Sequence, residues 1–259
     1  EIESSSMQRS PADISNVVMA IKCGASDTTS GMASNCVIGY VADRLVDLGA
    51  TVVFGETTEF IGGEHLLARR AVSKEVGDQI YTIVNKMEAR AKSLGCDMRK
   101  GQPTPGNIAG GLSSIEEKSL GAIVKSGTKP IQGVLDYPER VTNQKGLWIK
   151  DTPGREPEIL TGMAATGAQF MMFSTGRGAP QGFPSMPVIK ICGNPNTYER
   201  MEDDMDLNAG LIITGEKTIE QVGEEAFDKM IRTLNGEMTK NEAIQYFSSI
   251  DIQCLGPVI

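Results

Sequence analysis

The sequence predicts an α/β fold in which a mostly parallel sheet carries helices on both faces, a Rossmann-like arrangement of three layers. Short apolar runs typical of buried strands alternate along the chain with amphipathic helical segments. The first such unit, residues 17–55, has the strand–helix–strand order of a right-handed parallel crossover. The 259 residues are 40% hydrophobic and 22% charged, which suits a chain that buries its own core.

Composition excludes several classes of function. The chain has 25 Lys and Arg against 33 Asp and Glu, a net charge of −8, so nucleic acid and anionic membranes are unfavourable partners. No apolar run approaches the roughly 20 residues that span a bilayer, and no signal peptide opens the chain. The single His argues against a Ser-His-Asp triad carried by this chain alone.

Five widely spaced cysteines contain no C-x-x-C pair. This pattern indicates free thiols in a cytoplasmic protein and argues against a zinc ribbon or a disulfide framework. The cysteines are Cys23, Cys36, Cys96, Cys192 and Cys254.

Residues 1–15 are expected to be a frayed terminal segment, and residues 16–259 a single α/β domain. Apolar residues at helical spacing define the first helices, Gly49 ends one of them, and Ser73 is positioned to cap another. The expected elements are strand 17–21, helix 34–48, strand 51–55, helix 63–71 and helix 73–94.

Residues 95–112 are rich in Gly and Pro and are expected to form a long loop, a kind of segment that is usually functional or a linker. The helix that follows has a clear start, because Ser113 and Ser114 each precede a glutamate by three residues. We therefore interpret Glu116 and Glu117 as helix-capping residues.

The second half of the chain continues the alternation of strands and helices, with a last short helix before the C-terminus. The expected elements are strands 131–135 and 147–150, helix 158–166, strands 169–173, 188–191 and 211–213, and helix 218–234.

Three loops that leave predicted strands are dense in Gly and polar residues: 22–31, 56–59 and 174–182. Ligands of open α/β sheets bind outside the carboxyl ends of the strands, so we expect these loops to converge at one edge. A nucleotide cofactor is not expected, because the glycines of 176–182 do not have G-x-G-x-x-G spacing and no P-loop motif occurs.

The same loops contain candidate chemical groups. Asp27, Glu56 and Glu59 offer hard oxygen ligands for Mg, Mn or Fe(II), although each alone equally suits a solvated loop acid. Cys23 follows Lys22 at a strand end, where a lowered thiol pKa is one interpretation and a small packed core residue the other. Arg177, in a Gly-rich loop, suits a substrate carboxylate.

Five segments, which keep their order over residues 17–215, together resemble the altronate and galactarate dehydratases. One departure is Ala25, where that family usually has Gly, which adds a Cβ where backbone approaches ligand. The segments are Lys-Cys-Gly-Ala-Ser-Asp at 22–27 with Ser30-Gly31 and Asn35, Glu-Thr-Thr-Glu at 56–59, Pro-Gly-Asn at 105–107 with Gly-Gly at 110–111 and Glu-Lys-Ser-Leu-Gly at 117–121, Phe-Ser-Thr-Gly-Arg-Gly at 173–178, and Asp-Leu-Asn-Ala-Gly at 206–210.

The resemblance implies the C-terminal domain of a sugar-acid dehydratase whose full-length members carry further domains upstream. Their implied reaction is β-elimination of water from an aldonate or aldarate to give a 2-keto-3-deoxy acid, with Fe(II) or Mn(II). The alternatives are the large subunit of a sulfolactate sulfo-lyase, or a structural or oligomerisation domain that is inactive alone. The implied partners are a sugar acid, a missing N-terminal domain or small subunit, and further copies of the chain.

The resemblance also implies two groups of site residues. It leaves open which acid is the base and which is a metal ligand, with Asp27, Glu56 and Glu59 as the metal candidates. The catalytic group is Cys23, Asp27, Glu56, Glu59 and Lys118. The substrate-binding group is Ser26, Ser30, Asn107, Thr175, Gly176, Arg177, Asp206 and Asn208.

Overall fold

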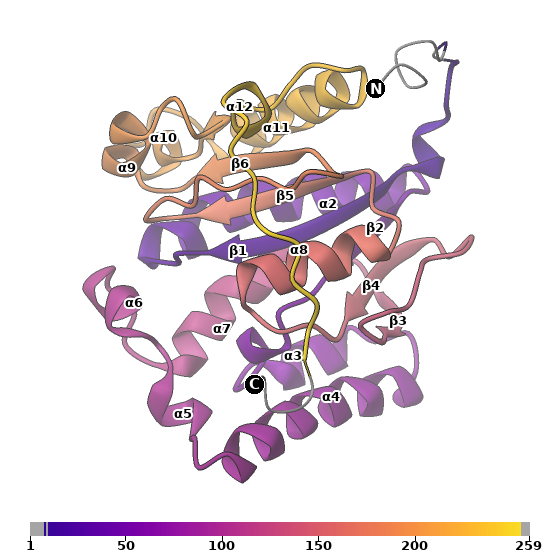
Figure 1. Ribbon diagram of the computed structural model, residues 1–259, viewed down its shortest axis with the longest axis vertical. Coiled ribbons are helices and arrows are strands. Elements are labelled where there is room, and N and C mark those ends of the chain that lie inside the picture. Colours follow the sequence, from indigo (N-terminus) through magenta and orange to yellow (C-terminus); the bar gives the residue numbers. More distant parts are fainter. Residues whose placement is uncertain (1–7, 9, 255–259) are drawn as a thin grey trace.

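The protein, seen in a computed structural model that describes residue 8 and residues 10–254, is built on one seven-stranded sheet (Figure 1). The strand order is β3-β4-β2-β1-β5-β6-β7, and every pairing between these strands is parallel. The predicted α/β class is therefore confirmed. The strands are β1 (Val18–Gly24), β2 (Thr51–Phe54), β3 (Ile131–Leu135), β4 (Gly146–Lys150), β5 (Phe170–Thr175), β6 (Val188–Cys192) and β7 (Leu207–Asn208).

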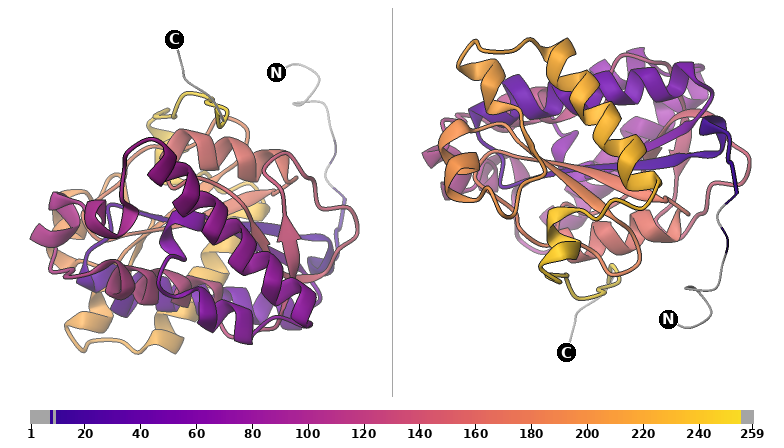
Figure 2. Two further views of the ribbon diagram at one scale, coloured as in Figure 1. Left: turned by 90° about the horizontal axis from the view of Figure 1, so that it is seen from below. Right: turned by 90° about the horizontal axis from the view of Figure 1, so that it is seen from above.

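Helices cover both faces of the sheet, as Figure 2 shows. The apolar sides of α2 (Asn35–Asp47), α4 (Lys74–Ser93) and α11 (Ile219–Leu234) pack in the larger core cluster. On the other face, α8 (Glu156–Ala165) packs in a smaller cluster with inward residues of β1 and β5. Because both faces are covered, the central strands are buried along nearly their whole length, which explains their continuous apolar sequences.

Short helices fill most of the connections. Ser73 caps α4 by accepting a hydrogen bond from Val76 N, and Ser114 caps the helix after the Gly/Pro segment by accepting from Glu117 N. Glu117 in turn accepts from Ser113 N, whereas Glu116 faces Arg99 instead. The remaining elements are η1 (Ile14–Asn16), η2 (Ser30–Ser34), η3 (Thr57–Glu59), α3 (Glu64–Arg69), α5 (Met98–Gly101), α6 (Pro105–Ala109), α7 (Ile115–Ile123), η4 (Val124–Ser126), α9 (Pro195–Arg200), α10 (Gly210–Ile213) and α12 (Lys240–Ala243).

Two predictions about local structure were wrong. The apolar run 211–213 is not a strand but part of α10, which begins where the side chain of Asn208 accepts from Gly210 N. A run this short does not distinguish strand from helix by its pattern. Segment 95–112 is not without secondary structure, because Asp97 and Thr104 cap the short helices α5 and α6.

The predicted frayed segment 1–15 lies mostly outside the described residues, although Asp13 caps the 3-10 turn η1. Among the described residues are all five cysteines, and all are free, as predicted. No helix in this part of the chain has the length and apolar character needed to cross a membrane.

The order of the strands reverses at β1. The chain moves outward from β1 through β2 to the edge strand β3, returns to form β4 between β3 and β2, and then crosses to the other side of β1 for β5, β6 and β7. Ligands of open α/β sheets bind outside the carboxyl ends of strands at such a reversal. The register of β1 and β5 places Cys23 beside Ser174 and Gly24 beside Thr175 at this end of the sheet.

Candidate active site

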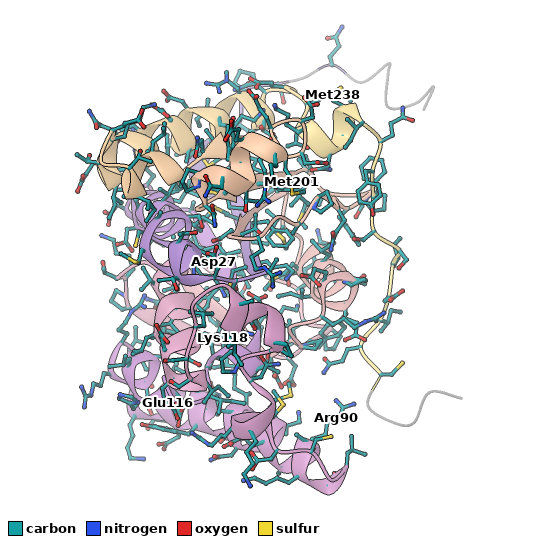
Figure 3. All side chains as sticks on the ribbon, turned by 90° about the vertical axis from the view of Figure 1, so that its left-hand side faces the viewer. Asp27, Arg90, Glu116, Lys118, Met201 and Met238 are labelled. Carbon is teal, nitrogen blue, oxygen red and sulfur yellow. The ribbon has the colours of Figure 1, made fainter. Side chains whose placement is uncertain are left out.

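The three exit loops predicted to meet do converge at the carboxyl ends of β1, β2 and β5. Cys23 N donates to Glu56 Oε2 at 2.9 Å, and Arg177 N donates to the carbonyl oxygen of Ala25 at 3.0 Å. Figure 3 looks at this end of the sheet, and Asp27 and Lys118 lie near its centre.

Two turns at this edge hold non-glycine residues in left-handed backbone conformations. Ala25 has φ 48° and Glu56 has φ 72°. The turn at Glu56 is fixed by the segment that follows β4, because Glu56 N donates to Thr152 Oγ1 at 2.7 Å. Such strain persists only where the surroundings over-determine the conformation, and it clusters at functional sites. Here it accompanies a carboxylate placed directly at the end of β1.

The Glu56 carboxylate, only 1% exposed, joins lysines from the two faces of the sheet. Its Oε1 lies 3.2 Å from Lys22 Nζ, on the face covered by α8, where Lys22 also lies 4.6 Å from the centre of the Phe173 ring. Its Oε2 lies 2.7 Å from Nζ of Lys125, which comes from η4 on the opposite face. Buried charges of this kind are retained when each is paired and hydrogen-bonded.

Glu59 and Cys23 complete this cluster around Lys125. Lys125 Nζ lies 3.0 Å from Glu59 Oε2 and 2.9 Å from Cys23 Sγ, and Cys23 Sγ lies 2.9 Å from Glu59 Oε2. Burial alone would raise the pKa of Glu59, but Lys125 and Lys118 outweigh it and lower that pKa to about 2. Glu59 is therefore a stable carboxylate at neutral pH.

The interpretation of Cys23 as an activated thiol is wrong. Burial, followed by the negative charges of Glu56 and Glu59, raises the pKa of the Cys23 thiol well above its ordinary value. Lys125 acts in the opposite direction but does not compensate for these effects. Cys23 is thus a protonated thiol that donates a hydrogen bond to Glu59.

A pocket of about 350 Å³ lies over this cluster and is bounded by β1, η3, α6, α7 and the start of α8. Lys118 reaches its wall from α7, donates to Gln102 Oε1 at 2.9 Å and Asn107 Oδ1 at 3.2 Å, and lies 4.0 Å from Glu59 Oε1. Glu156 reaches the pocket from α8 and is 31% exposed. The volume suits a small molecule, and acidic and basic groups share one wall.

A larger hollow, of about 810 Å³, lies at the far end of β1, between the segment before β1 and the end of α11. None of the clustered lysines and glutamates lines it. The smaller pocket is therefore the better candidate, because the chemistry lies there.

Asp27 lies next to this cluster but does not join it. Its Oδ1 accepts from Ser30 N at 2.9 Å and from Thr29 Oγ1 at 2.7 Å, while its Oδ2 accepts from Asn194 Nδ2 at 3.1 Å. The predicted metal candidates Asp27, Glu56 and Glu59 are therefore not gathered as one set. Among the described residues, the grouped donors are Cys23, Glu56 and Glu59, whose ligand atoms lie within 4.8 Å of one another.

The predicted substrate-binding residues fall into four groups. Ser26 and Asn107 line the pocket, whereas Ser30 is fully buried and bonds the backbone of Asp27. Thr175 is also buried and accepts from Gly178 N, so its hydroxyl shapes the 174–182 loop.

Gly176 and Arg177 continue this loop beside the pocket. A Cβ at Gly176 would lie 1.9 Å from Asp27 Oδ1, so only glycine permits this approach. The exposed side chain of Arg177 packs on Gly106, where an added Cβ would lie 2.3 Å from Nη1. Substrate binding by these two residues stays a prediction.

Asp206 and Asn208 do not lie with the pocket residues. The buried Asp206 carboxylate accepts from Lys190 N at 2.8 Å and Lys240 N at 3.0 Å, which ties β6 to α12. Asn208 accepts from Gly210 N at the start of α10. In the structure these two side chains have structural roles, Asp206 between β6 and α12 and Asn208 at the start of α10.

Sequence reasoning missed four charged residues of the site: Lys22, Lys125, Arg155 and Glu156. One available signal was spacing, because Lys118 and Lys125 are seven residues apart and thus on one side of a helix. Lysines on a helix usually indicate a solvated face, and only the packing of η4 against α2, with Lys125 paired to Glu56 and Glu59, shows the burial of Lys125.

A family model described as D-galactarate/altronate dehydratase, C-terminal, matches residues 14–254. The chain belongs to this family. The resemblance inferred from the sequence motifs is thereby confirmed, and the segments of this chain on which that resemblance was based contain Cys23, Glu56, Glu59 and Lys118.

Three relatives are proteins longer than this chain. It is 39% identical over 93% of its length to the (2R)-sulfolactate sulfo-lyase subunit beta of Chromohalobacter salexigens. It is 40% identical over 89% of its length to galactarate dehydratase (L-threo-forming) of Escherichia coli, and 34% over 91% to altronate dehydratase of Bacillus subtilis. The matches span 62%, 44% and 47% of these relatives, so the chain corresponds to about half of each.

Proposed function

We propose that the pocket is the elimination site of a lyase that removes water from an aldonate or aldarate and gives a 2-keto-3-deoxy acid. The observation that carries this proposal is the meeting of Lys118, Glu59 and Glu156 at one pocket over a buried cluster. Elimination next to a carboxylate needs a base for the α-proton and positive charge beside the developing enediolate. Both kinds of group are available at this pocket.

The proposed roles follow from charge and exposure. Lys118, oriented by Gln102 and Asn107, faces the substrate carboxylate and stabilises the enediolate. Glu156, partly exposed at the pocket wall, takes the α-proton, because Glu59 with a pKa of about 2 is a weak base. The electron pair of the C–H bond forms the enediolate, whose collapse forms the C=C bond as the C–O bond breaks, and the hydroxyl leaves as water with the proton that Glu156 has taken up. The enol product then tautomerises to the 2-keto acid.

A second candidate is elimination of sulfite from sulfolactate by the same logic. It is favoured by the match to the sulfo-lyase subunit, which extends over 62% of that protein, against 44% and 47% of the two dehydratases. Galactarate, altronate and sulfolactate therefore form the substrate panel that separates the two candidates.

The proposal extends to the whole protein, since its relatives are longer. We expect the isolated chain to fold but to turn over substrate poorly, because a pocket completed by another domain loses its alignment without it. Equal turnover by the isolated chain and the full-length protein would contradict this expectation. If both were inactive on the whole panel, the structural or oligomerisation alternative would be favoured.

Cofactor and location are also part of the proposal. Fe(II) or Mn(II) would act with oxygen atoms of the substrate at the open pocket, and no step above depends on the ion. A cytoplasmic location is supported by the five free thiols.

The test is an elimination assay of the full-length protein on the substrate panel, with Fe(II) or Mn(II) added. Lys118→Met should lower kcat/KM on the preferred substrate by about 10²–10³-fold, the usual cost of removing one group that stabilises developing negative charge. Lys100→Met is the matched control, because Lys100 is 87% exposed and does not line the pocket. Wild-type turnover by Lys118→Met on every substrate would refute the proposed site.

A further inference from the structure

The three donors Cys23, Glu56 and Glu59 have the spacing of a metal site, yet they surround a lysine. Lys125 Nζ lies 2.9 Å from Cys23 Sγ, 2.7 Å from Glu56 Oε2 and 3.0 Å from Glu59 Oε2. The side chain of Lys125 is 1% exposed. Its ammonium group therefore contacts all three of the atoms that would ligate an ion.

The protonation of the cluster also disfavours a divalent ion. A cysteine ligates metal as a thiolate, but the Cys23 thiol donates a hydrogen bond to Glu59 Oε2 at 2.9 Å. The Lys125 ammonium group forms ion pairs with both carboxylates, at 2.7 Å to Glu56 Oε2 and 3.0 Å to Glu59 Oε2. A second cation beside this ammonium would be repelled strongly, because the buried surroundings screen charge poorly.

The charges of the two glutamates are already balanced by lysines. Glu56 Oε1 lies 3.2 Å from Lys22 Nζ, and Glu59 Oε1 lies 4.0 Å from Lys118 Nζ. Two carboxylates thus face the ammonium groups of Lys22, Lys118 and Lys125. The set lacks the excess negative charge that would stabilise a dication.

We propose that Lys125 is the resident cation of the Cys23–Glu56–Glu59 cluster, and that a divalent ion enters the cluster only when this lysine is removed. Lys125 is then a positioning residue, which holds both glutamates beneath the pocket with one ammonium group. Any ion that the activity needs binds outside this donor set. The inference rests on the cluster and not on the identity of the substrate.

The test uses Co(II), because a cysteine thiolate bound to Co(II) gives a charge-transfer absorption that carboxylates alone do not. Full-length wild-type protein titrated with Co(II) should show no such band that depends on Cys23. Lys125→Met should gain the band, and the double variant Lys125→Met/Cys23→Ser should lose it again. Lys125→Arg, which keeps a cation, should behave as the wild type.

Two results would overturn the inference. One is a wild-type Co(II)–thiolate band that disappears in Cys23→Ser, a comparison that needs no change at Lys125 and holds even if Lys125→Met does not fold. The other is a folded Lys125→Met protein without the band, which would show that Lys125 is not what keeps the ion out. Neither result depends on turnover, so failure here is distinguishable from failure of the proposed lyase activity.

Discussion

Lys22 and Lys125 lie in the cluster beneath the pocket, whereas Lys150 and Lys190 lie on the flanking strands β4 and β6; all four side chains are buried. The first pair shares Glu56 as a common ion-pair partner. Burial would lower the pKa of both lysines, but the neighbouring negative charges raise it above its ordinary value. Both remain ammonium groups.

The second pair is stabilised differently. Lys150 donates to the carbonyl oxygen of Glu139, and Lys190 to that of Pro180. Among the described residues neither makes an ion pair. Burial lowers the pKa of each to about 8, and nearby acids, among them Asp206 for Lys190, oppose this only in part.

The difference shows where this fold concentrates charge. At the carboxyl ends of β1 and β2, acids and lysines are buried together, so the cluster stays ionised and fixed in place. Along β4 and β6, the ammonium group of a buried lysine donates to a carbonyl oxygen and has no ion-pair partner among the described residues, so its charge is destabilised. A fixed field of ammonium and carboxylate groups is what an elimination site requires, and only the first region provides it.

The largest expected effect comes from breaking the compensated cluster. Glu56→Gln leaves Lys22 and Lys125 without their shared carboxylate, and we expect a loss of about 3–5 kcal/mol in the free energy of unfolding. Urea denaturation of the variant and the wild type measures this loss. A loss of less than about 1 kcal/mol in the free energy of unfolding would contradict the view that Glu56 stabilises the buried lysines of the cluster.

The control for this prediction is an ion pair on the surface. Lys74 and Asp78 pair at 2.6 Å, four residues apart on α4, and both side chains are mostly exposed. Asp78→Asn should change the free energy of unfolding by no more than about 0.5 kcal/mol, because solvent and salt screen such pairs.

The second prediction is an acid dependence caused by Glu59. Its pKa is about 2 in the folded protein against a usual value of 4.5, so the unfolded state binds the proton first as the pH falls. Between about pH 4.5 and pH 2, wild-type stability should fall relative to Glu59→Gln by about 1.4 kcal/mol per pH unit. Denaturation of both proteins across this range measures the difference between their free energies of unfolding. A difference that stays constant with pH would contradict the lowered pKa of Glu59.

Much of the fold was predictable because its signals are local. The β1–α2–β2 unit follows from apolar runs and a helical stripe, and Ser73 marks the start of α4 as expected. The run 211–213 was misassigned because three apolar residues carry no period. Helices α5 and α6 were missed because Gly and Pro predict a loop while the caps at Asp97 and Thr104 act locally.

The candidate site was predictable only in part. Convergence of the loops at Cys23 and Glu56 follows from parallel topology, since all strands end at the same edge. Tertiary packing decides that Lys125 is buried and that the Asp27 carboxylate is occupied by hydrogen bonds. Sequence patterns do not predict such packing. The protonated state of Cys23 likewise follows from its buried acidic neighbours, which are distant in sequence.

The third prediction concerns the lysines that lack acidic partners. Because the pKa of Lys190 is about 8 in the folded protein and 10.5 ordinarily, the unfolded state binds more protons between these values. Wild-type stability should therefore rise with pH in this window, by on the order of 1–2 kcal/mol relative to Lys190→Met. The quantity to compare is the slope of the free energy of unfolding against pH. The Pro180 carbonyl loses its partner in Lys190→Met, but this destabilises the variant equally at each pH and leaves the slope unchanged. A parallel pH dependence of the two proteins would show that Lys190 keeps its ordinary pKa.

The smallest expected effect tests whether the compensated region also holds its turn under strain. Ala25 follows the strand that carries Lys22, has φ 48° and is exposed, so replacing it with Gly removes backbone strain without removing packing. Ala25→Gly should raise the free energy of unfolding by about 0.5–1 kcal/mol, because a left-handed conformation is unfavourable for alanine and accessible to glycine.

The matched control is Ala68→Gly within helix α3, where glycine should lower the free energy of unfolding by about 0.5–1 kcal/mol. Urea denaturation of both variants should thus give changes of opposite sign. If Ala25→Gly destabilised the protein as much as Ala68→Gly, the turn after β1 would be unstrained.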